Sequence, residues 1–270
     1  MGQHVRRGRG HRPLIIGIAG CGRMGAPMLA ALRRAGFDAR GFDIVAGRGD
    51  DHDIDAFKQD LTTLITVVRD QDETDDILLD KQALVTCQSL ETIIISSTLS
   101  PRYTRELRTR VPAHIALIDA PMSGAQVRAE AGTLTFMLGG DCTDHMPLFA
   151  AMGQDIHHMG AFGAGMAAKV LNNMLAATST AMTRMVLDWA DNAGIDERQL
   201  LDLIHSASGQ NWLASGFDQI EFARHGFADN NSIGILAKDV EAALDMAPDG
   251  ADLTLPRTIQ TAIKSLKPRS

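Results

Sequence analysis

Residues 14–37, "LIIGIAGCGRMGAPMLAALRRAGF", give the strongest indication of the fold in this chain of 270 residues. A short run of β-prone apolar residues, 14–19, leads into a glycine-rich turn at 20–25, and an amphipathic helical pattern then continues to Gly36. A second β-prone run, 38–43, follows at once. A strand, a turn, a helix and a second strand in this order form the unit from which parallel sheets are built.

The same alternation of strand-like and helix-like segments continues to about residue 160. Further β-prone apolar runs occur at 64–68, 92–96, 115–119 and 134–138. Beyond residue 160 the periodicity is helical, with little that suggests a strand. We therefore predict an α/β fold, with an N-terminal Rossmann-type doubly wound sheet followed by an all-α C-terminal domain. The predicted bounds are a flexible N-terminal extension at 1–13, the Rossmann domain at 14–162 and the helical domain at 163–270.

The composition limits the classes of function. Hydrophobic residues make up 45% and charged residues 22% of the chain, as in globular proteins with a sizeable core. The net charge of −7 argues against general affinity for nucleic acid, and no apolar run approaches the ~20 residues that span a bilayer. The three cysteines lack a paired spacing, which predicts reduced thiols in a cytoplasmic protein. No nucleic-acid or membrane partner is expected.

One alternative concerns the N-terminus. Residues 18–21, "IAGC", have the form of a bacterial lipoprotein cleavage site behind a basic opening. The apolar run before them is short, however, and the glycines after Cys21 continue the strand–turn–helix pattern.

The glycine-rich turn has the spacing GxGxxG, placed between a strand and a helix. In such turns the first glycine permits the tight turn, the second lets the backbone approach a pyrophosphate, and the third lets helix and strand pack closely. Asp43 ends the second strand, where a carboxylate can accept hydrogen bonds from a ribose and repel a 2′-phosphate. We predict an NAD site, with NADP as the alternative because Arg40 and Arg48 lie nearby. Its residues are Gly20, Gly22, Arg23, Met24, Gly25 and Asp43. No metal site is predicted.

Lys169 is the only formally charged residue between Ile156 and Thr183. Asn172 and Asn173 follow it by three and four positions, so the three side chains share one face of a helix. An ammonium group in apolar surroundings is costly unless it is paired, reaches solvent or is used. On these residues alone, a lysine that reaches solvent and a functional lysine both remain open.

Five blocks, in this order, resemble the β-hydroxyacid dehydrogenase family, which includes 3-hydroxyisobutyrate dehydrogenase and tartronate-semialdehyde reductase. They are "GIAGCGRMGAPMLAAL", "SSTLSP", "DAPMSGAQVRAEAGTLTFMLGG", "GAGMAAKVLNN" and "LAKDVEAAL". The resemblance implies an oxidoreductase that transfers a hydride between NAD(P) and a short 3-hydroxy acid or its semialdehyde. It also implies a helical domain like the C-terminal domain of 6-phosphogluconate dehydrogenase, and association as a homodimer or tetramer.

The resemblance implies roles for individual residues as well. Lys169 matches the family's general acid/base, and Asn173 matches an asparagine that orients the substrate. Ser123 and Gly124 match the segment that holds the substrate carboxylate. The remaining matches are Thr98, near the nicotinamide and the substrate; Lys238, which closes over the cofactor; and Trp212, in a stretch that lines the cleft.

The chain also departs from the family pattern. The connection between residues 43 and 64 is short, which leaves open whether a helix follows the second strand, and the chain ends early after the last helical pattern. Ala125 and Arg128 stand where the family has glycines. For Arg128, binding of a second substrate carboxylate and a surface role both remain open. The alternatives to a hydroxyacid dehydrogenase are a catalytically impaired NAD(P)-binding protein of the same fold and an imine reductase, a group that typically replaces the lysine retained here.

Overall fold

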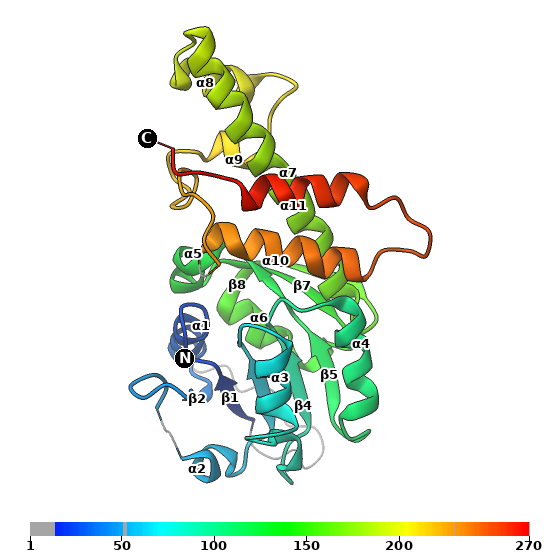
Figure 1. Ribbon diagram of the computed structural model, residues 1–270. Coiled ribbons are helices and arrows are strands. Elements are labelled where there is room, and N and C mark those ends of the chain that lie inside the picture. Colours follow the sequence, from blue (N-terminus) through cyan, green and yellow to red (C-terminus); the bar gives the residue numbers. More distant parts are fainter. Residues whose placement is uncertain (1–13, 51–52, 230, 270) are drawn as a thin grey trace. The chain divides into compact units, whose positions relative to one another are not determined.

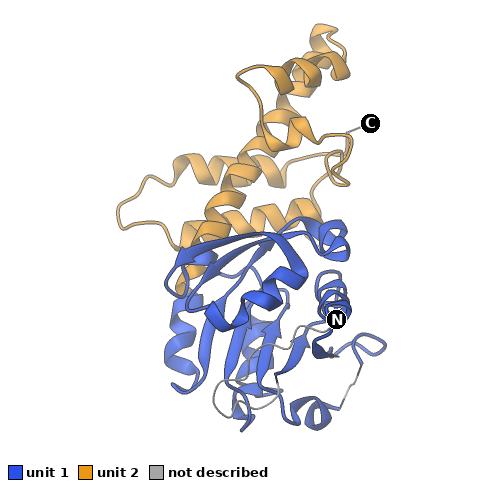
Figure 2. Ribbon diagram, turned by 180° about the vertical axis from the view of Figure 1, so that it is seen from behind, with its two compact units in different colours: residues 1–99, 103–166 blue, residues 100–102, 167–270 orange. Residues whose placement is uncertain are grey.

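The computed structural model describes residues 14–50, 53–229 and 231–269. The chain divides into two compact units, which Figure 2 shows in different colours. Unit 1 comprises Met1–Leu99 and Tyr103–Met166, and unit 2 comprises Ser100–Arg102 and Ala167–Ser270. The extension predicted at 1–13 lies outside the described residues.

Unit 1 is built on a mixed sheet whose strand order is β2-β1-β3-β4-β5-β7-β6, with β8 paired to β7 (Figure 1). The first five strands run parallel, whereas β7 is antiparallel to β5 and β6 and parallel to β8. The strands are β1 (Ile15–Ala19), β2 (Asp38–Phe42), β3 (Thr63–Thr66), β4 (Thr92–Ile95), β5 (Ala116–Asp119), β6 (Met122–Ser123), β7 (Leu134–Gly139) and β8 (Gly153–Gly160). All six predicted strands are confirmed. The prediction missed β6, which is two residues long, and β8, whose side chains are mostly polar and exposed.

Apolar residues on both faces of this sheet explain its doubly wound architecture. On β4, Ile94 packs into the core that contains α1, whereas Ile93 and Ile95 pack into the opposite core, as the two-residue period of a strand requires. The helices of unit 1 are α1 (Gly25–Arg34), α2 (Ile54–Lys58), α3 (Gln71–Leu78), α4 (Pro101–Arg110, which begins in unit 2), α5 (Ala125–Ala131) and α6 (Met146–Met152), with short 3-10 helices η1 (Leu84–Thr86) and η2 (Thr143–His145). The predicted fold class is confirmed.

A helix does follow the second strand, although it has only five residues. The side chain of Asp53 caps α2 by accepting a hydrogen bond from the Asp55 backbone, which satisfies a free N–H group of the first turn. Phe57 anchors the helix, because its ring is 1% exposed and lies 5.3 Å from that of Phe42.

The described part of unit 2 contains helices and no strand. They are α7 (Ala164–Ala193, whose first turn belongs to unit 1), α8 (Glu197–Ser206), α9 (Trp212–Ser215), α10 (Ser232–Asp245) and α11 (Thr254–Lys264). One apolar cluster joins α7, α10 and α11 through residues such as Ala177, Val240 and Ile263. A second cluster joins the end of α7 to α8 and α9 through Leu187, Leu201 and Leu213.

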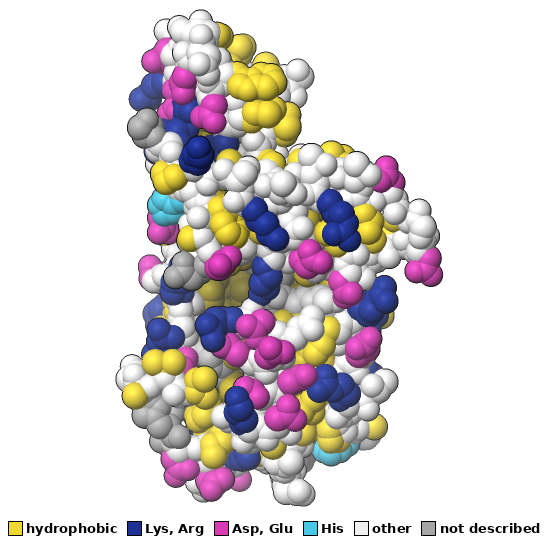
Figure 3. Space-filling view, in the orientation of Figure 1, with side chains coloured by type: hydrophobic (Ala, Val, Ile, Leu, Met, Phe, Trp, Pro, Cys, Tyr) yellow, Lys and Arg dark blue, Asp and Glu magenta, His cyan; other side chains and the backbone are white. Residues whose placement is uncertain are grey.

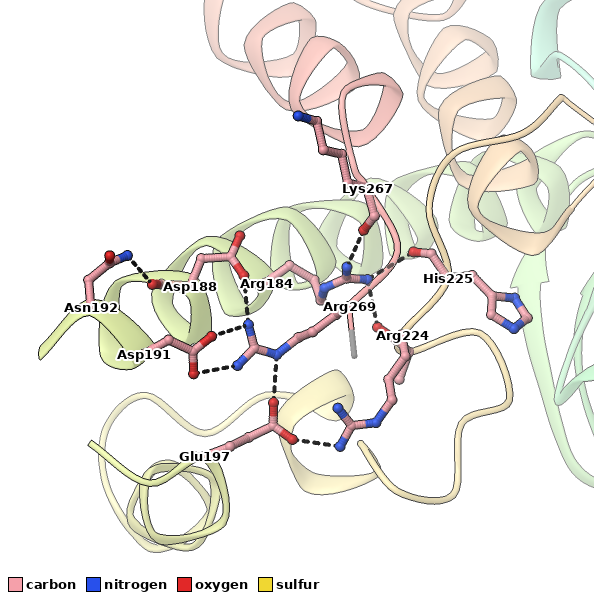
Figure 4. Close-up of polar contacts among 10 residues, drawn as sticks. Arg184, Asp188, Asp191, Asn192, Glu197, Arg224, His225, Lys267 and Arg269 are labelled. Carbon is pink, nitrogen blue, oxygen red and sulfur yellow. Dashed lines mark hydrogen bonds and ion pairs between the residues drawn. The ribbon is translucent and has the colours of Figure 1, made fainter. Parts of the chain in front are cut away.

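Polar contacts of Arg184 and Arg269 connect residues 267–269 to α7 and α8 (Figure 4). The Arg269 side chain is only 8% exposed and forms ion pairs with Asp188, Asp191 and Glu197. Arg184 donates hydrogen bonds to backbone carbonyls, those of Ala223, His225 and Lys267. Because guanidinium groups present several donors in a fixed plane, each arginine can join several segments at once.

The surface seen in Figure 3 carries Lys and Arg side chains interspersed with Asp and Glu. Among the described residues, no helix combines the length and the apolar character that crossing a membrane would need.

Candidate active site

Three glycines shape the turn between β1 and α1. Gly20 has a φ of +95°, and a Cβ atom there would lie 2.4 Å from the carbonyl oxygen of Val67. A Cβ atom at Gly25 would lie 1.8 Å from the carbonyl oxygen of Gly20, so packing between turn and helix requires glycine there. At Gly22, by contrast, a Cβ atom would meet no protein atom within 4 Å. Packing within the protein therefore does not require glycine at position 22, and the missing side chain leaves the backbone there open to the approach of a ligand.

Asp43 connects the end of β2 to this turn. Its carboxylate is 7% exposed, and its Oδ2 accepts a 2.8 Å hydrogen bond from the backbone nitrogen of Cys21. Its Oδ1 accepts a 2.8 Å hydrogen bond from the backbone nitrogen of Val45. The acidic group thus lies beside the glycine turn that leads into α1, and Met24 provides no side-chain cap at the N-terminus of that helix. Helix N-termini favour phosphate groups through their N–H groups and the helix dipole.

A cavity and two arginines lie in the surroundings of Asp43. A cavity of about 530 Å³ is lined by Asp43, Phe42, Ile44, Ala46, Ile54, Lys81 and Gln82. Arg40 donates to the carbonyl of Gln59 and lies over the Phe57 ring, and Arg48 is exposed in the loop after β2. The turn, the helix N-terminus and the carboxylate therefore fit the pyrophosphate and the ribose of a dinucleotide.

The predicted substrate residues of unit 1 lie at the ends of strands. Thr98 follows β4 and is half-buried, as are Ser123 and Gly124. Ser123 ends β6 directly opposite Thr135 of β7. Gly124 has a φ of +131° and Ala125 a φ of +54°, so the chain turns sharply through two unusual conformations there. For Ala125 this left-handed conformation is strained, and such strain is often found at functional sites.

In unit 2, Lys169 and Asn173 share one face of α7, as predicted, and meet an acid that the prediction missed. Lys169 is 7% exposed, Asn173 8% and Asp239 1%. Asn173 Nδ2 donates a 2.5 Å hydrogen bond to Asp239 Oδ2. The other carboxylate oxygen, Oδ1, is buried and has no hydrogen-bond partner in the described part of the chain.

Burial and charge act in opposite directions on this cluster. Burial lowers the pKa of Lys169, and the nearby charge of Asp239 partly opposes that shift. Burial likewise raises the pKa of Asp239, against the charge of Lys169 and the hydrogen bond from Asn173. The interpretation of Lys169 as a lysine that reaches solvent is wrong for this structure, because almost the whole residue is buried. A buried amine with a lowered pKa can exchange a proton more readily near neutral pH than an exposed one.

The helical period of residues 232–245 is the sequence signal that points to Asp239. Asp239 stands next to Lys238 on α10, and neighbouring helical residues point about 100° apart. Lys238 is exposed, while Asp239 points into the unit.

Trp212 lies near the same helix as Lys169. Its Nε1 donates a 3.4 Å hydrogen bond to the carbonyl of Ala176 on α7, and its ring lies 6.0 Å from that of Phe222. Ala176 lies ~10 Å along the helix from Lys169, because each residue rises 1.5 Å. Within the described ranges, no group of three His, Cys, Asp or Glu side chains could hold a metal ion.

Comparison with known proteins places this architecture in a family. Residues 15–163 match the NAD-binding domain of 6-phosphogluconate dehydrogenase, and residues 163–267 match the NAD-binding region of NADP-dependent 3-hydroxyisobutyrate dehydrogenase. The chain therefore belongs to the β-hydroxyacid dehydrogenase family, as the resemblance predicted. It is an NAD(P)-dependent oxidoreductase with a Rossmann-type domain, and NAD is its expected cofactor.

Individual relatives span nearly the whole chain. The NAD-dependent L-serine dehydrogenase of Pseudomonas aeruginosa is 30% identical over 259 residues, which cover 88% of this chain and 87% of that protein. A probable 3-hydroxyisobutyrate dehydrogenase of Mycobacterium bovis is 32% identical over 260 residues, covering 89% and 88%. The structure of Mycobacterium tuberculosis 3-hydroxyisobutyrate dehydrogenase with L-serine matches with a TM-score of 0.78 at 28% identity, covering 95% of this chain and 97% of that one.

Proposed function

We propose that this protein transfers a hydride between NAD and a short 3-hydroxy acid or its semialdehyde, with Lys169 as the general acid/base. The buried cluster of Lys169, Asn173 and Asp239 carries the proposal, because it combines a buried amine with a hydrogen-bonded acid on a scaffold that belongs to a dehydrogenase family. NAD, when bound, supplies the group that accepts or donates the hydride. The chain's own residues must bind the two reactants and move a proton.

Oxidation of a hydroxy acid requires a base for the hydroxyl proton. Burial favours the neutral form of Lys169, which can accept that proton through Nζ. In the reducing direction the ammonium form of Lys169 donates a proton to the forming alcohol. The Asn173 amide carries two protons, one of which it donates to Asp239. We propose that the second orients a substrate oxygen.

The relatives support the substrate class. The two dehydrogenases above are named for L-serine and 3-hydroxyisobutyrate, which share a hydroxymethyl group and a carboxylate on one carbon. We propose that Ser123 and Gly124 hold that carboxylate, that Thr98 contacts nicotinamide and substrate, and that Trp212 contacts the substituent. For the cofactor we propose Gly20, Gly22, Arg23, Met24, Gly25, Asp43, Thr98 and Lys238.

The organisation of the protein follows from the same proposal. Residues 14–162 would bind NAD(P), and residues 163–270 would serve substrate binding and dimerisation. The described cysteines, Cys21, Cys87 and Cys142, are all free and buried, which agrees with a reducing compartment; a cytoplasmic location stays a prediction.

The test is a substrate screen that follows the absorbance of the reduced nicotinamide, with NAD and NADP in parallel. We expect turnover of L-serine, 3-hydroxyisobutyrate or a related acid. An impaired protein would bind NAD, measured by calorimetry, yet oxidise none of them. Reduction of cyclic imines without any hydroxy-acid turnover would favour an imine reductase instead.

A further inference from the structure

Arg128 lies over the turn that we propose for the substrate carboxylate. A Cβ atom built at Gly124 would come within 2.8 Å of both Cβ and Cδ of Arg128, so the aliphatic part of the arginine folds back over this glycine. The guanidinium lies on the same side, because Nη1 is 3.4 Å from the hydroxyl of Thr135. Thr135 is the residue of β7 directly opposite Ser123, and side chains directly opposite in an antiparallel pair stand on the same face. The charge of Arg128 therefore lies beside Ser123 and Gly124.

The guanidinium is held loosely in this place. The two polar contacts of the guanidinium are both long, at 3.4 Å to Thr135 and 3.3 Å to Asp155. The side chains of Arg128 and Asp155 are 40% and 49% exposed, and ion pairs this exposed contribute little to stability. Arg128 can thus exchange Asp155 for an anionic ligand without a large cost to the fold.

We propose that Arg128 determines substrate specificity by binding a second carboxylate, so that the preferred substrate is a short 3-hydroxy acid with two acidic groups. This inference rests on the proposed function, in which Ser123 and Gly124 hold the first carboxylate. A guanidinium matches the two oxygens of a carboxylate with its planar pair of N–H donors. The same charge repels an ammonium substituent such as that of serine.

Three acids that differ in the substituent on one carbon test the inference. L-Serine carries an ammonium, 3-hydroxyisobutyrate a methyl and 2-(hydroxymethyl)succinate a carboxymethyl group. We expect kcat/KM of the wild type with NAD to be highest for the diacid, by about 10- to 100-fold over 3-hydroxyisobutyrate, the range of a charge-assisted hydrogen bond. Serine should be the poorest of the three.

Substitutions of Arg128 and Asp155, which form the ion pair, test the same inference directly. Arg128→Gln removes the charge and should lower kcat/KM for the diacid by about 10- to 100-fold, mainly through KM, and should lower kcat/KM for 3-hydroxyisobutyrate by a much smaller factor. Asp155→Asn removes the competing carboxylate and should increase the preference for the diacid. Arg110→Gln is the matched control, because Arg110 is 39% exposed and also pairs with an aspartate, Asp75; it should change none of the three values. Thermal melting checks that each variant folds.

The outcomes separate this inference from the proposed function. If the monoacids are oxidised but the wild type shows no preference for the diacid, or if Arg128→Gln lowers all three values equally, Arg128 does not select for a second carboxylate and only this inference fails. If none of the three acids is oxidised, the proposed function fails and this inference with it.

Discussion

Asn173 on α7 donates a 2.5 Å hydrogen bond from Nδ2 to Asp239 Oδ2 on α10, although the two residues are 66 positions apart in the chain. The contact holds Asp239 at a position where its charge raises the pKa of Lys169, against the lowering effect of burial. The proton affinity of Lys169 therefore depends on two helices that are distant in sequence.

Lys169→Arg should keep the positive charge but remove proton exchange, because a guanidinium does not lose its proton in proteins. We expect the oxidation rate to fall by about 10²–10⁴-fold, the usual contribution of a general acid/base. NAD affinity and thermal melting should change little. A variant that retains wild-type turnover on the best substrate would show that Lys169 has a structural role only.

The pH dependence of the wild type should reveal the same group. Oxidation needs the neutral amine, so kcat/KM should rise with pH through an ionisation below 10.5, since burial lowers the pKa of Lys169 from that value. Reduction needs the ammonium form and should decline through the same ionisation.

Asp239→Asn should move that ionisation to lower pH. The charge of Asp239 raises the pKa of Lys169, so its removal leaves burial unopposed. The measurement is the pH profile of kcat/KM for oxidation, compared with that of Glu241→Gln, a substitution two positions further along α10. A shift to higher pH, or an equal shift in both variants, would contradict an electrostatic action of Asp239 on Lys169.

Asp43→Ser should narrow or reverse a preference for NAD over NADP. In the proposed site the buried carboxylate beside Cys21 would repel a 2′-phosphate, and serine would remove that repulsion while keeping a hydrogen-bonding group. The two dissociation constants can be measured by calorimetry, with Asp38→Asn, at the exposed start of β2, as the control. Tighter binding of NADP by the wild type would show that another residue, such as Arg48, sets the preference.

A second copy of the chain should bind an exposed face of α7. Leu175, Met182 and Trp189 are 69%, 46% and 65% exposed and recur every seven residues, so they lie along one side of this 30-residue helix. The regular spacing suits a symmetric helix pair, and burial of each large side chain contributes about 1.5–3 kcal/mol. We expect a homodimer or larger assembly by light scattering at micromolar concentration.

Leu175→Glu or Trp189→Glu should shift this protein toward the monomer. Leu255→Glu is the control, because Leu255 is 68% exposed on α11, outside this face. A wild-type protein that is monomeric at these concentrations, or control and test variants that dissociate alike, would rule out α7 as the interface.

The local sequence pattern is sufficient to predict the doubly wound sheet and the glycine turn. Strand and helix periods, and the glycines whose missing side chains permit the turn, are properties of neighbouring residues. These periods and glycines can therefore be recognised in the sequence of residues 14–43 without any tertiary contact. The same holds for the shared helix face of Lys169 and Asn173, which follows from their spacing alone.

Only the packing of the folded chain determines which side chains that are distant in sequence come into contact. Asp239 lies against Asn173 because α7 and α10 pack together, and Arg128 lies beside Ser123 because β6 pairs with β7 in one register. Strands β6 and β8 form although one is very short and the other mostly polar, since pairing with β7 supplies the hydrogen bonds that local pattern did not predict. Burial, which turns Lys169 from an ordinary surface lysine into a candidate acid/base, is also a property of the packed fold, because desolvation depends on all surrounding atoms rather than on sequence neighbours.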